Sequence, residues 1–205
     1  MHRIFAFVTL GLALQFNSPL SAGELSGAEH PLQVNIMEEP AQFTEPYHCA
    51  FITAGENKFT FIIPQGFRLK SDPASGRLVI GNSTGVGSIS FAILSSDPDG
   101  SPITSEECRA AALRMHQDAR IVQGFTPRVL GRSGQGVDLE WKVSDGLYEC
   151  QRVAYVPTPF GVFMFTATSG RKGFPEIRDG LDVVLATFRS STDGKFHPAH
   201  IDTTN

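Results

Sequence analysis

The sequence lacks a concentrated run of basic residues. Its 205 residues include 17 lysines and arginines against 21 aspartates and glutamates, so the formal net charge is −4. A nucleic-acid-binding surface needs clustered cations, because it must neutralise closely spaced phosphates. We therefore expect no nucleic-acid partner, and the mild acidity by itself indicates no other partner.

A hydrophobic run long enough to span a membrane is also lacking. The apolar run at residues 4–14 is shorter than the roughly 20 residues that a membrane-spanning helix needs. It ends at Asn17–Pro19 and precedes the small residue Ala22, which is typical of a signal peptide covering residues 1–22. No cysteine lies near the cut for a lipid anchor. We expect export, periplasmic or secreted, with no stable membrane span after cleavage; the alternatives are cleavage one residue later and a retained anchor.

Cysteine is scarce, with three residues in the chain: Cys49, Cys108 and Cys150. In an oxidising compartment, one disulfide and one remaining thiol are the simplest outcome. Because Cys108 lies on the apolar face of a predicted helix, burial alone accounts for it. We favour a Cys49–Cys150 disulfide, while the two other pairings and three reduced thiols remain alternatives. A bond closing a loop near 100 residues would stabilise the fold by about 4 kcal/mol in the chain-entropy model.

The chain divides by composition into four segments. After the signal peptide, residues 23–46 are rich in Glu, Pro, Gly and Gln, which predicts a flexible N-terminal arm. Weak alternation at residues 33–36 is compatible with a short edge strand there. Residues 47–190 are predicted to form a single α+β domain, and residues 191–205 a polar tail.

Two neighbouring strands organise the predicted domain. Leu147 to Gly170 reads as a strand, a Pro/Gly turn and a second strand that is apolar on both faces, so both of its faces need cover. The preceding segment 137–143 alternates apolar and charged residues, which predicts one buried face and one face in water. The charged positions of that wet face are Asp138, Glu140 and Lys142, with Arg132 and Arg152 as possible cross-strand partners.

Two amphipathic helices are predicted to cover the sheet. Thr104 and Glu107 form a capping-box pattern, and an apolar stripe runs from Cys108 to Ala119. A last helix follows Pro175 and ends near Phe188. Short turns join the strands, so we predict a mainly antiparallel sheet of about six to seven strands in an α/β/α sandwich.

Three segments make the layout similar to the PsbP-like superfamily. They are an aromatic strand closing in Pro-x-Gly-aromatic, a Gly-Val-Asp-Leu-Glu-Trp strand, and a terminal helix closing in Thr-Phe, at residues 59–67, 136–141 and 185–188. The resemblance covers about residues 58–190. That superfamily includes a photosystem II extrinsic subunit, a Ran-binding protein and DcrB-type envelope proteins. It implies accessory or binding work, mostly without catalysis, and no residue-level site.

Short polar motifs are weak indications of chemistry. Residues 81–85 match G-x-S-x-G, but the segment that follows reads as a strand where a nucleophile elbow needs a helix, which favours a hairpin turn. The same segment holds a glycosylation sequon at Asn82. In the polar tail, His197, His200 and Asp202 have metal-ligand side chains but no rigid scaffold. We predict no catalytic residue, metal site or cofactor.

The most economical reading is an exported, non-enzymatic accessory or binding module of the cell envelope or extracellular space. Its expected partner is another envelope or secreted protein. Phe160, in the Pro-Thr-Pro-Phe-Gly turn, is the candidate partner contact, with folding back onto the core as the alternative. A small-ligand carrier with a pocket between sheet and helix is the runner-up, and a serine hydrolase using Ser83 is a third hypothesis.

Overall fold

A computed structural model describes residues 32–39, 47–70, 77–94 and 102–191. The predicted signal peptide, most of the predicted arm and the tail from residue 192, with its two histidines, lie outside these ranges. No helix among the described residues is long and apolar enough to cross a membrane.

The main structural element is a seven-stranded sheet in which every neighbouring pair is antiparallel. The strand order across it is β4-β5-β6-β12-β11-β10-β7. The strands are β4 (Phe67–Leu69), β5 (Leu78–Asn82), β6 (Gly87–Ile93), β7 (Arg120–Phe125), β10 (Gln135–Ser144), β11 (Leu147–Thr158) and β12 (Gly161–Gly170). The predicted antiparallel sheet is confirmed, and β11 and β12 lie inside it as expected.

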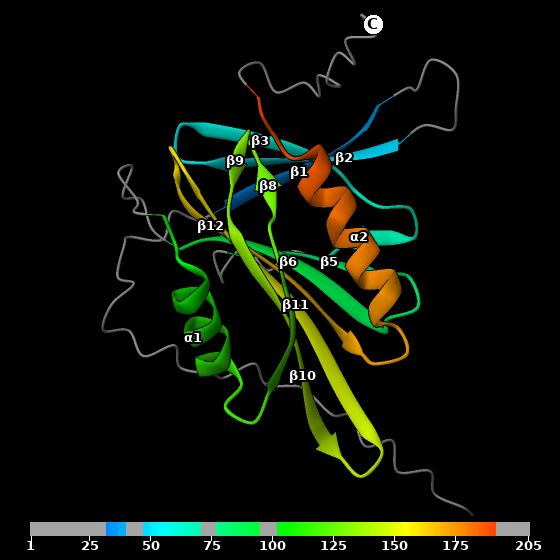
Figure 1. Ribbon diagram of the computed structural model, residues 1–205. Helices are drawn as coiled ribbons and strands as arrows, with labels where there is room; N and C mark the ends of the chain where they lie inside the picture. Colours follow the sequence, from blue (N-terminus) through cyan, green and yellow to red (C-terminus); the bar gives the residue numbers. More distant parts are fainter. Residues whose placement is uncertain (1–31, 40–46, 71–76, 95–101, 192–205) are drawn as a thin grey trace, which may run out of the picture.

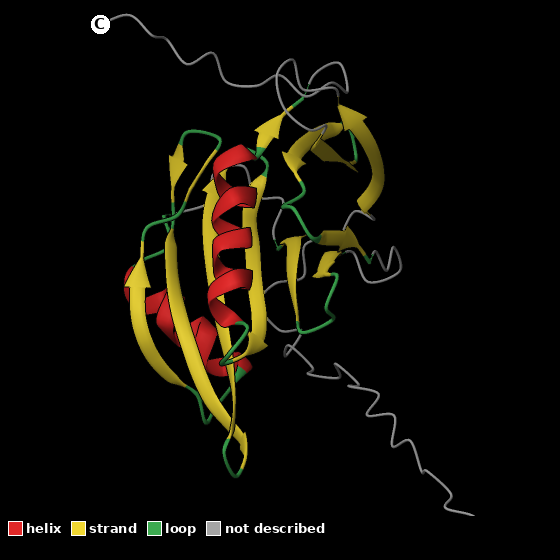
Figure 2. Ribbon diagram, turned by 90° about the vertical axis from the view of Figure 1, so that its right-hand side faces the viewer, coloured by secondary structure: helices red, strands yellow, loops and turns green. Residues whose placement is uncertain are grey.

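The two predicted helices lie on opposite faces of this sheet (Figure 2). Helix α1 (Ser105–Met115) packs Cys108 and Ala112 against one face, and α2 (Phe174–Thr187) packs Ile177 and Leu181 against the other. Strand β12 sends alternate side chains to each side, with Phe163 in the α2 cluster and Met164 in the α1 cluster. The α+β sandwich is therefore as predicted.

A second sheet of four strands was not predicted. Its order is β1-β2-β3-β13, from β1 (Leu32–Glu39), β2 (Tyr47–Ala54), β3 (Asn57–Ile62) and β13 (Arg189–Ser190). Strand β1 falls inside the segment assigned to the arm and pairs along its whole length with β2. This sheet lies beyond the end of α2 (Figure 1) and contributes Phe59 and Phe61 to the larger apolar cluster. A two-stranded ribbon, β8 (Arg128–Val129) with β9 (Arg132–Ser133), completes the fold.

Phe188 joins the two sheets and α2. It follows the last residue of α2, is fully buried, and has five other phenylalanine rings within 5.2–5.9 Å. The five rings come from β3, β6 and β12 and are Phe59, Phe61, Phe91, Phe163 and Phe165. Large aromatic side chains bury much apolar area at a small entropic cost, so this ring stabilises the junction.

The capping box predicted for α1 is present in full. The backbone N–H of Glu107 donates a hydrogen bond to Thr104 Oγ1 at 3.2 Å. The backbone N–H of Thr104 donates a second hydrogen bond to Glu107 Oε2 at 2.8 Å. The helix ends at Met115, so the extension of its apolar stripe to Ala119 is wrong. The chain instead turns into β7, an edge strand that was not predicted.

The expected Cys49–Cys150 disulfide is not formed. All three cysteines lie in described segments, and no disulfide joins any two of them. Cys49 belongs to β2 in the smaller sheet and Cys150 to β11 in the larger one, so no strand pairing brings the two side by side. Each of the three side chains is buried.

Candidate functional site

The face of β10 that was predicted to lie in water is buried. Asp138 and Glu140 are only 3% and 6% exposed, and Arg152 of the adjacent strand is 7% exposed. Only Lys142, near the end of the strand, remains on the surface. The prediction of a hydrated face is wrong, because α2 and basic side chains from three segments cover the carboxylates.

Arg152 is the centre of the first buried ion pair. Its Nε and Nη2 atoms donate to the two oxygens of Asp138 at 2.8 and 3.1 Å, and Nη1 donates to Asp182 of α2 at 2.9 Å. Gln123 of β7 donates to the same Asp138 carboxylate at 2.6 Å. The ring of Phe125 lies 4.2 Å from the guanidinium carbon. Three strands and a helix are therefore joined through one guanidinium.

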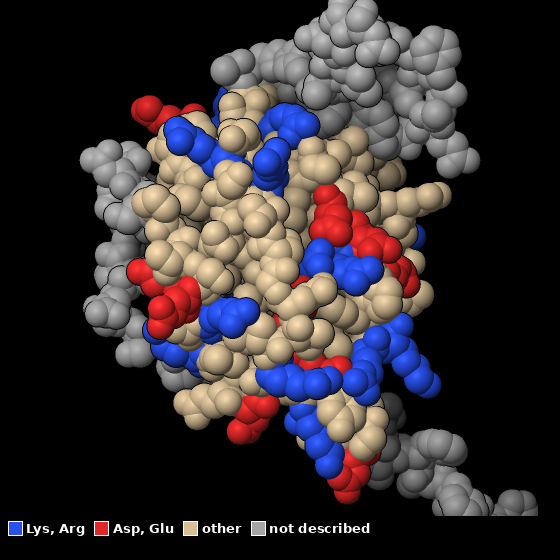
Figure 3. Space-filling view, in the orientation of Figure 1, with Lys and Arg blue, Asp and Glu red and all other residues tan. Residues whose placement is uncertain are grey.

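Glu140 forms a second ion pair with two arginines. Arg120 donates to Oε1 at 2.6 Å, and Arg171 donates to Oε2 at 2.8 Å. The hydrogen bond from Arg120, aided by the positive charge of Arg171, lowers the pKa of Glu140. A general acid or base needs a pKa near the working pH, and this carboxylate is displaced away from it. The arrangement suits structural pairing better than proton transfer. Acidic and basic side chains are interspersed over the face that carries α2 (Figure 3).

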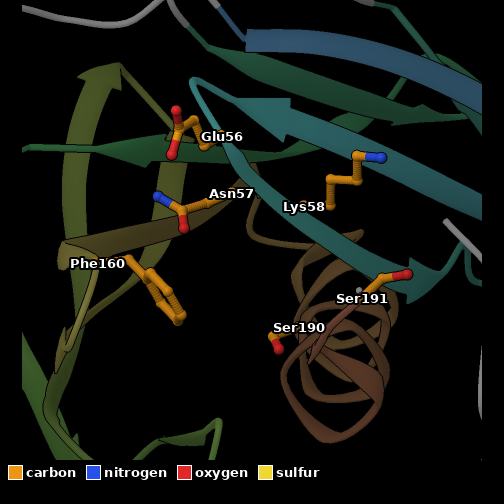
Figure 4. A pocket seen from close by; sticks show the side chains of 6 residues that line it. All are labelled: Glu56, Asn57, Lys58, Phe160, Ser190 and Ser191. Atoms are coloured by element: carbon orange, nitrogen blue, oxygen red, sulfur yellow. The ribbon is translucent and has the colours of Figure 1, made fainter. Parts of the chain in front are cut away.

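An open pocket of about 360 Å³ lies at the opposite end of the molecule, where the two sheets meet. Strand β3 and the turn before it supply three polar side chains, the β11–β12 turn supplies one ring, and the end of β13 supplies two serines. The lining residues are Glu56, Asn57, Lys58, Phe160, Ser190 and Ser191 (Figure 4). The Ser191 backbone N–H bonds to the Lys58 carbonyl at 2.8 Å, which holds two of these segments together.

Phe160, the predicted contact residue, is partly exposed and also packs against the core. Its ring packs edge-to-face on Phe59 at 5.2 Å between centroids, yet it is only partly buried and lines the pocket. Thr158 fixes the turn, since its Oγ1 accepts from the Phe160 N–H at 3.2 Å and donates to the Gly161 carbonyl at 2.8 Å. Gly161 has φ 111°, a conformation that favours glycine. The ring is thus held firmly at the rim of the pocket.

Ser83 lies in the turn of the β5–β6 hairpin, with a strand on each side. The elbow of G-x-S-x-G hydrolases joins a strand to a helix, and that local geometry is not formed here. Asn82 beside it is 3% exposed, and its Oδ1 accepts from the backbone N–H groups of Val86 and Gly87 at 2.9 and 3.3 Å. Within the described ranges, no group of three or more His, Cys, Asp or Glu side chains is placed to hold a metal ion.

These features define a class: an α+β sandwich with a helix on each face of an antiparallel sheet. No family model matches the sequence, and no curated protein matches it in sequence. Among solved structures, the cyanobacterial PsbP protein CyanoP of Synechocystis sp. PCC 6803 is similar with a TM-score of 0.50 and 12% identity. That likeness covers 85% of this chain and 100% of CyanoP. The predicted resemblance to PsbP-like proteins is confirmed as a likeness of fold.

Two further structures show weaker likeness. LpqN, described as involved in cell envelope biogenesis of Mycobacterium tuberculosis, has a TM-score of 0.44 and 13% identity over 77% of this chain and 92% of its own. A Bacteroides thetaiotaomicron protein has a TM-score of 0.42 and 15% identity over 68% of this chain. The chain spans 47% of that protein's length.

Proposed function

We propose that this chain is an exported, non-enzymatic binding module of the cell envelope or extracellular space, and that it contacts its partner at the pocket beside Phe160. The observation that carries the proposal is the pocket itself. Its walls come from the turn before β3, the β11–β12 turn and the end of β13, all supported by the two sheets. Recognition residues are commonly found on loops that a scaffold holds in this way. The CyanoP-like fold is compatible with this role, and the leader-like N-terminal sequence supports export.

Site-specific cross-linking tests the contact. A photo-reactive amino acid replaces Asn57 at the pocket in the full chain, and Lys142 at the opposite end serves as the matched exposed control. We expect the Asn57 position to yield one defined adduct in native envelope or secreted fractions, and the Lys142 position to yield none. Identical adducts from both positions, or none from either, would contradict a partner site at the pocket.

Export has a separate test. Expression of the full chain with a C-terminal tag should give a mature protein whose N-terminus lies just after residue 22 and which leaves the cytoplasm. A tagged chain that keeps residues 1–22 and stays in the cytoplasmic fraction would exclude the exported role. The fold and the pocket would be unaffected by that result.

A small-ligand carrier is the second candidate, and the volume of the pocket favours it. About 360 Å³ lies at the small end of the roughly 300–1,000 Å³ of typical ligand sites. A ligand that binds the folded state raises the melting temperature. We expect such a rise with at least one class in a broad metabolite panel, and an unchanged melting temperature across the panel would contradict the carrier role.

A further inference from the structure

The pocket beside Phe160 has no net charge among its side chains. Glu56 and Lys58 carry opposite charges, and Asn57 and Ser190 are neutral groups that each donate and accept hydrogen bonds. An anionic ligand would meet the Glu56 carboxylate beside the ring, and the Lys58 charge two residues away keeps the lining as a whole from favouring a cation. Two ligand classes fit a neutral lining of mixed donors and acceptors: a zwitterion, such as a free amino acid, and a neutral polyhydroxyl compound.

The directions of the side chains separate these two classes. Figure 4 shows Glu56, Asn57 and Phe160 on one side of the pocket, while the Lys58 amine points away from Phe160. A zwitterion would need an ammonium group turned toward its carboxylate, and Lys58 is the only lysine or arginine in the lining. The side that faces the ring instead offers a carboxylate and an amide, which accept and donate hydrogen bonds to hydroxyl groups.

Phe160 supplies the second part of a sugar site. An aromatic ring carries partial negative charge on its face, which attracts the weakly positive C–H groups of a sugar ring. The ring projects from the β11–β12 turn into the pocket (Figure 4) and packs edge-to-face on Phe59. Because the ring is already fixed, little conformational freedom is lost when a ligand lies on it.

From this arrangement we infer that the pocket binds a single neutral sugar unit, with Phe160 against the ring and Glu56 and Asn57 bonded to its hydroxyl groups. The volume of about 360 Å³ suits one ring rather than a long chain. The unit is either a free sugar or the exposed end of a larger glycan, since both present the same chemistry. The inference rests on the proposed binding role of this pocket and specifies its ligand.

The test is a titration of the isotope-labelled chain followed by amide chemical shifts. The probes are glucose, galactose, N-acetylglucosamine and their disaccharides, with free phenylalanine as the zwitterion. A soluble polysaccharide with the same terminal sugar distinguishes a free sugar from a glycan end. We expect saturable shifts at residues 56–58, 160 and 190 with at least one neutral sugar, and none there with phenylalanine.

Three variants locate the effect. Phe160→Leu keeps an apolar side chain against Phe59 but removes the flat ring, and Asn57→Ala alters an exposed side chain, so both should fold. We expect each to weaken sugar binding up to about tenfold, the upper end for one aromatic contact or one hydrogen bond. Lys142→Ala, an exposed change at the opposite end of the molecule, should leave binding within about twofold.

Three outcomes would overturn the inference: no saturable shift with any sugar, sugar shifts confined to other residues, or phenylalanine binding that Lys58→Ala abolishes. Cross-linking at Asn57 reads the proposed partner contact independently of these titrations. A defined protein adduct together with negative sugar titrations would refute the sugar ligand and leave the binding module standing. Loss of both would refute the two proposals together.

Discussion

Arg152 of β11 and Asp138 of β10 form a two-pronged ion pair beneath helix α2, with hydrogen bonds of 2.8 and 3.1 Å. Both side chains are more than nine-tenths buried. A buried charge left without its partner is costly, because nothing replaces the lost hydration. Asp182 on α2 bonds to the same guanidinium, but its side chain is 54% exposed. The two carboxylates should therefore differ greatly in their effect on stability.

Replacement of Asp138 by alanine tests this difference. We expect Asp138→Ala to lower the free energy of unfolding by about 3–5 kcal/mol, the usual cost of breaking a buried pair. Asp182→Ala should cost under about 1 kcal/mol, as for other half-exposed pairs. Urea denaturation of the full chain measures both. Equal losses in the two variants would contradict the assignment of Asp138 as the partner that compensates the buried charge.

The strand pattern in the sequence was sufficient to predict β10 and the burial of Val137 and Leu139, whereas Val143 on the same predicted face is 52% exposed. It did not predict the burial of the other face. Alternating charges such as Asp138 and Glu140 normally indicate a solvated face. The two arginines that pair with Glu140, Arg120 and Arg171, lie 20 and 31 residues from it in the chain. Only the assembled sheet brings them together, so no local pattern indicates the pairing. The exception is Arg152, which was expected as a cross-strand partner and is one.

Local sequence patterns indicated the pocket even less than they indicated the buried ion pairs. Phe160 was identified because an aromatic side chain at the tip of a Pro/Gly turn can contact a partner, and that signal is local. Glu56, Asn57 and Lys58 read only as a turn and a strand start, and Ser190 only as the last residue of the predicted domain. These segments meet because β13 pairs with β3, a contact between residues about 130 positions apart. Pairing over that distance is set by the tertiary fold and not by propensity.

Acid should weaken the fold through Glu140. The hydrogen bond from Arg120 holds the pKa of Glu140 below its unfolded value of about 4.3. The resulting stabilisation is complete above the unfolded pKa and is lost as the pH falls through the folded pKa. We expect the stability difference between the native sequence and Glu140→Gln to be constant near neutral pH and to narrow below about pH 4.3. Urea midpoints from pH 7 to pH 3 measure it, and a constant difference over that range would contradict the pairing.

We expect the side chain of Asn82 to stabilise the β5–β6 hairpin and the side chain of Ser83 to contribute little. Asn82→Ala removes the acceptor of two backbone N–H groups in a buried position, so we expect a loss of about 1–3 kcal/mol. Ser83→Ala is the control. Its side chain is exposed in the turn, so its effect should stay within about 0.5 kcal/mol. Thermal or urea unfolding measures the pair, and similar losses in the two variants would contradict the role assigned to Asn82.

The same burial bears on the glycosylation sequon. Asn82 is 3% exposed, its Oδ1 accepts a hydrogen bond from the Val86 N–H, and its Nδ2 donates one to Glu176. The side chain therefore has no room for a glycan in the folded protein. Secretion of the chain from a eukaryotic host should therefore yield protein whose mass does not change on treatment with an amide-cleaving glycosidase. A folded, stable product carrying a glycan on Asn82 would contradict the buried placement of this residue.

The cysteines should behave as buried thiols and not as a disulfide. Burial raises the pKa of Cys108 and of Cys150 to about 11, and the nearby Glu140 carboxylate adds to the rise for Cys150. Since the thiolate is the reactive form, at pH 8 both should react with iodoacetamide roughly two orders of magnitude more slowly in the folded chain than in urea.

The decisive measurement uses chain secreted into an oxidising compartment and purified without reductant. After unfolding in urea and alkylation, its mass should show three modified cysteines, one for each thiol in the sequence. A single modified cysteine would demonstrate that two thiols are joined after all. Peptide mapping would then identify the pair, and a Cys49–Cys150 bond would place β2 and β11 close together although they belong to separate sheets.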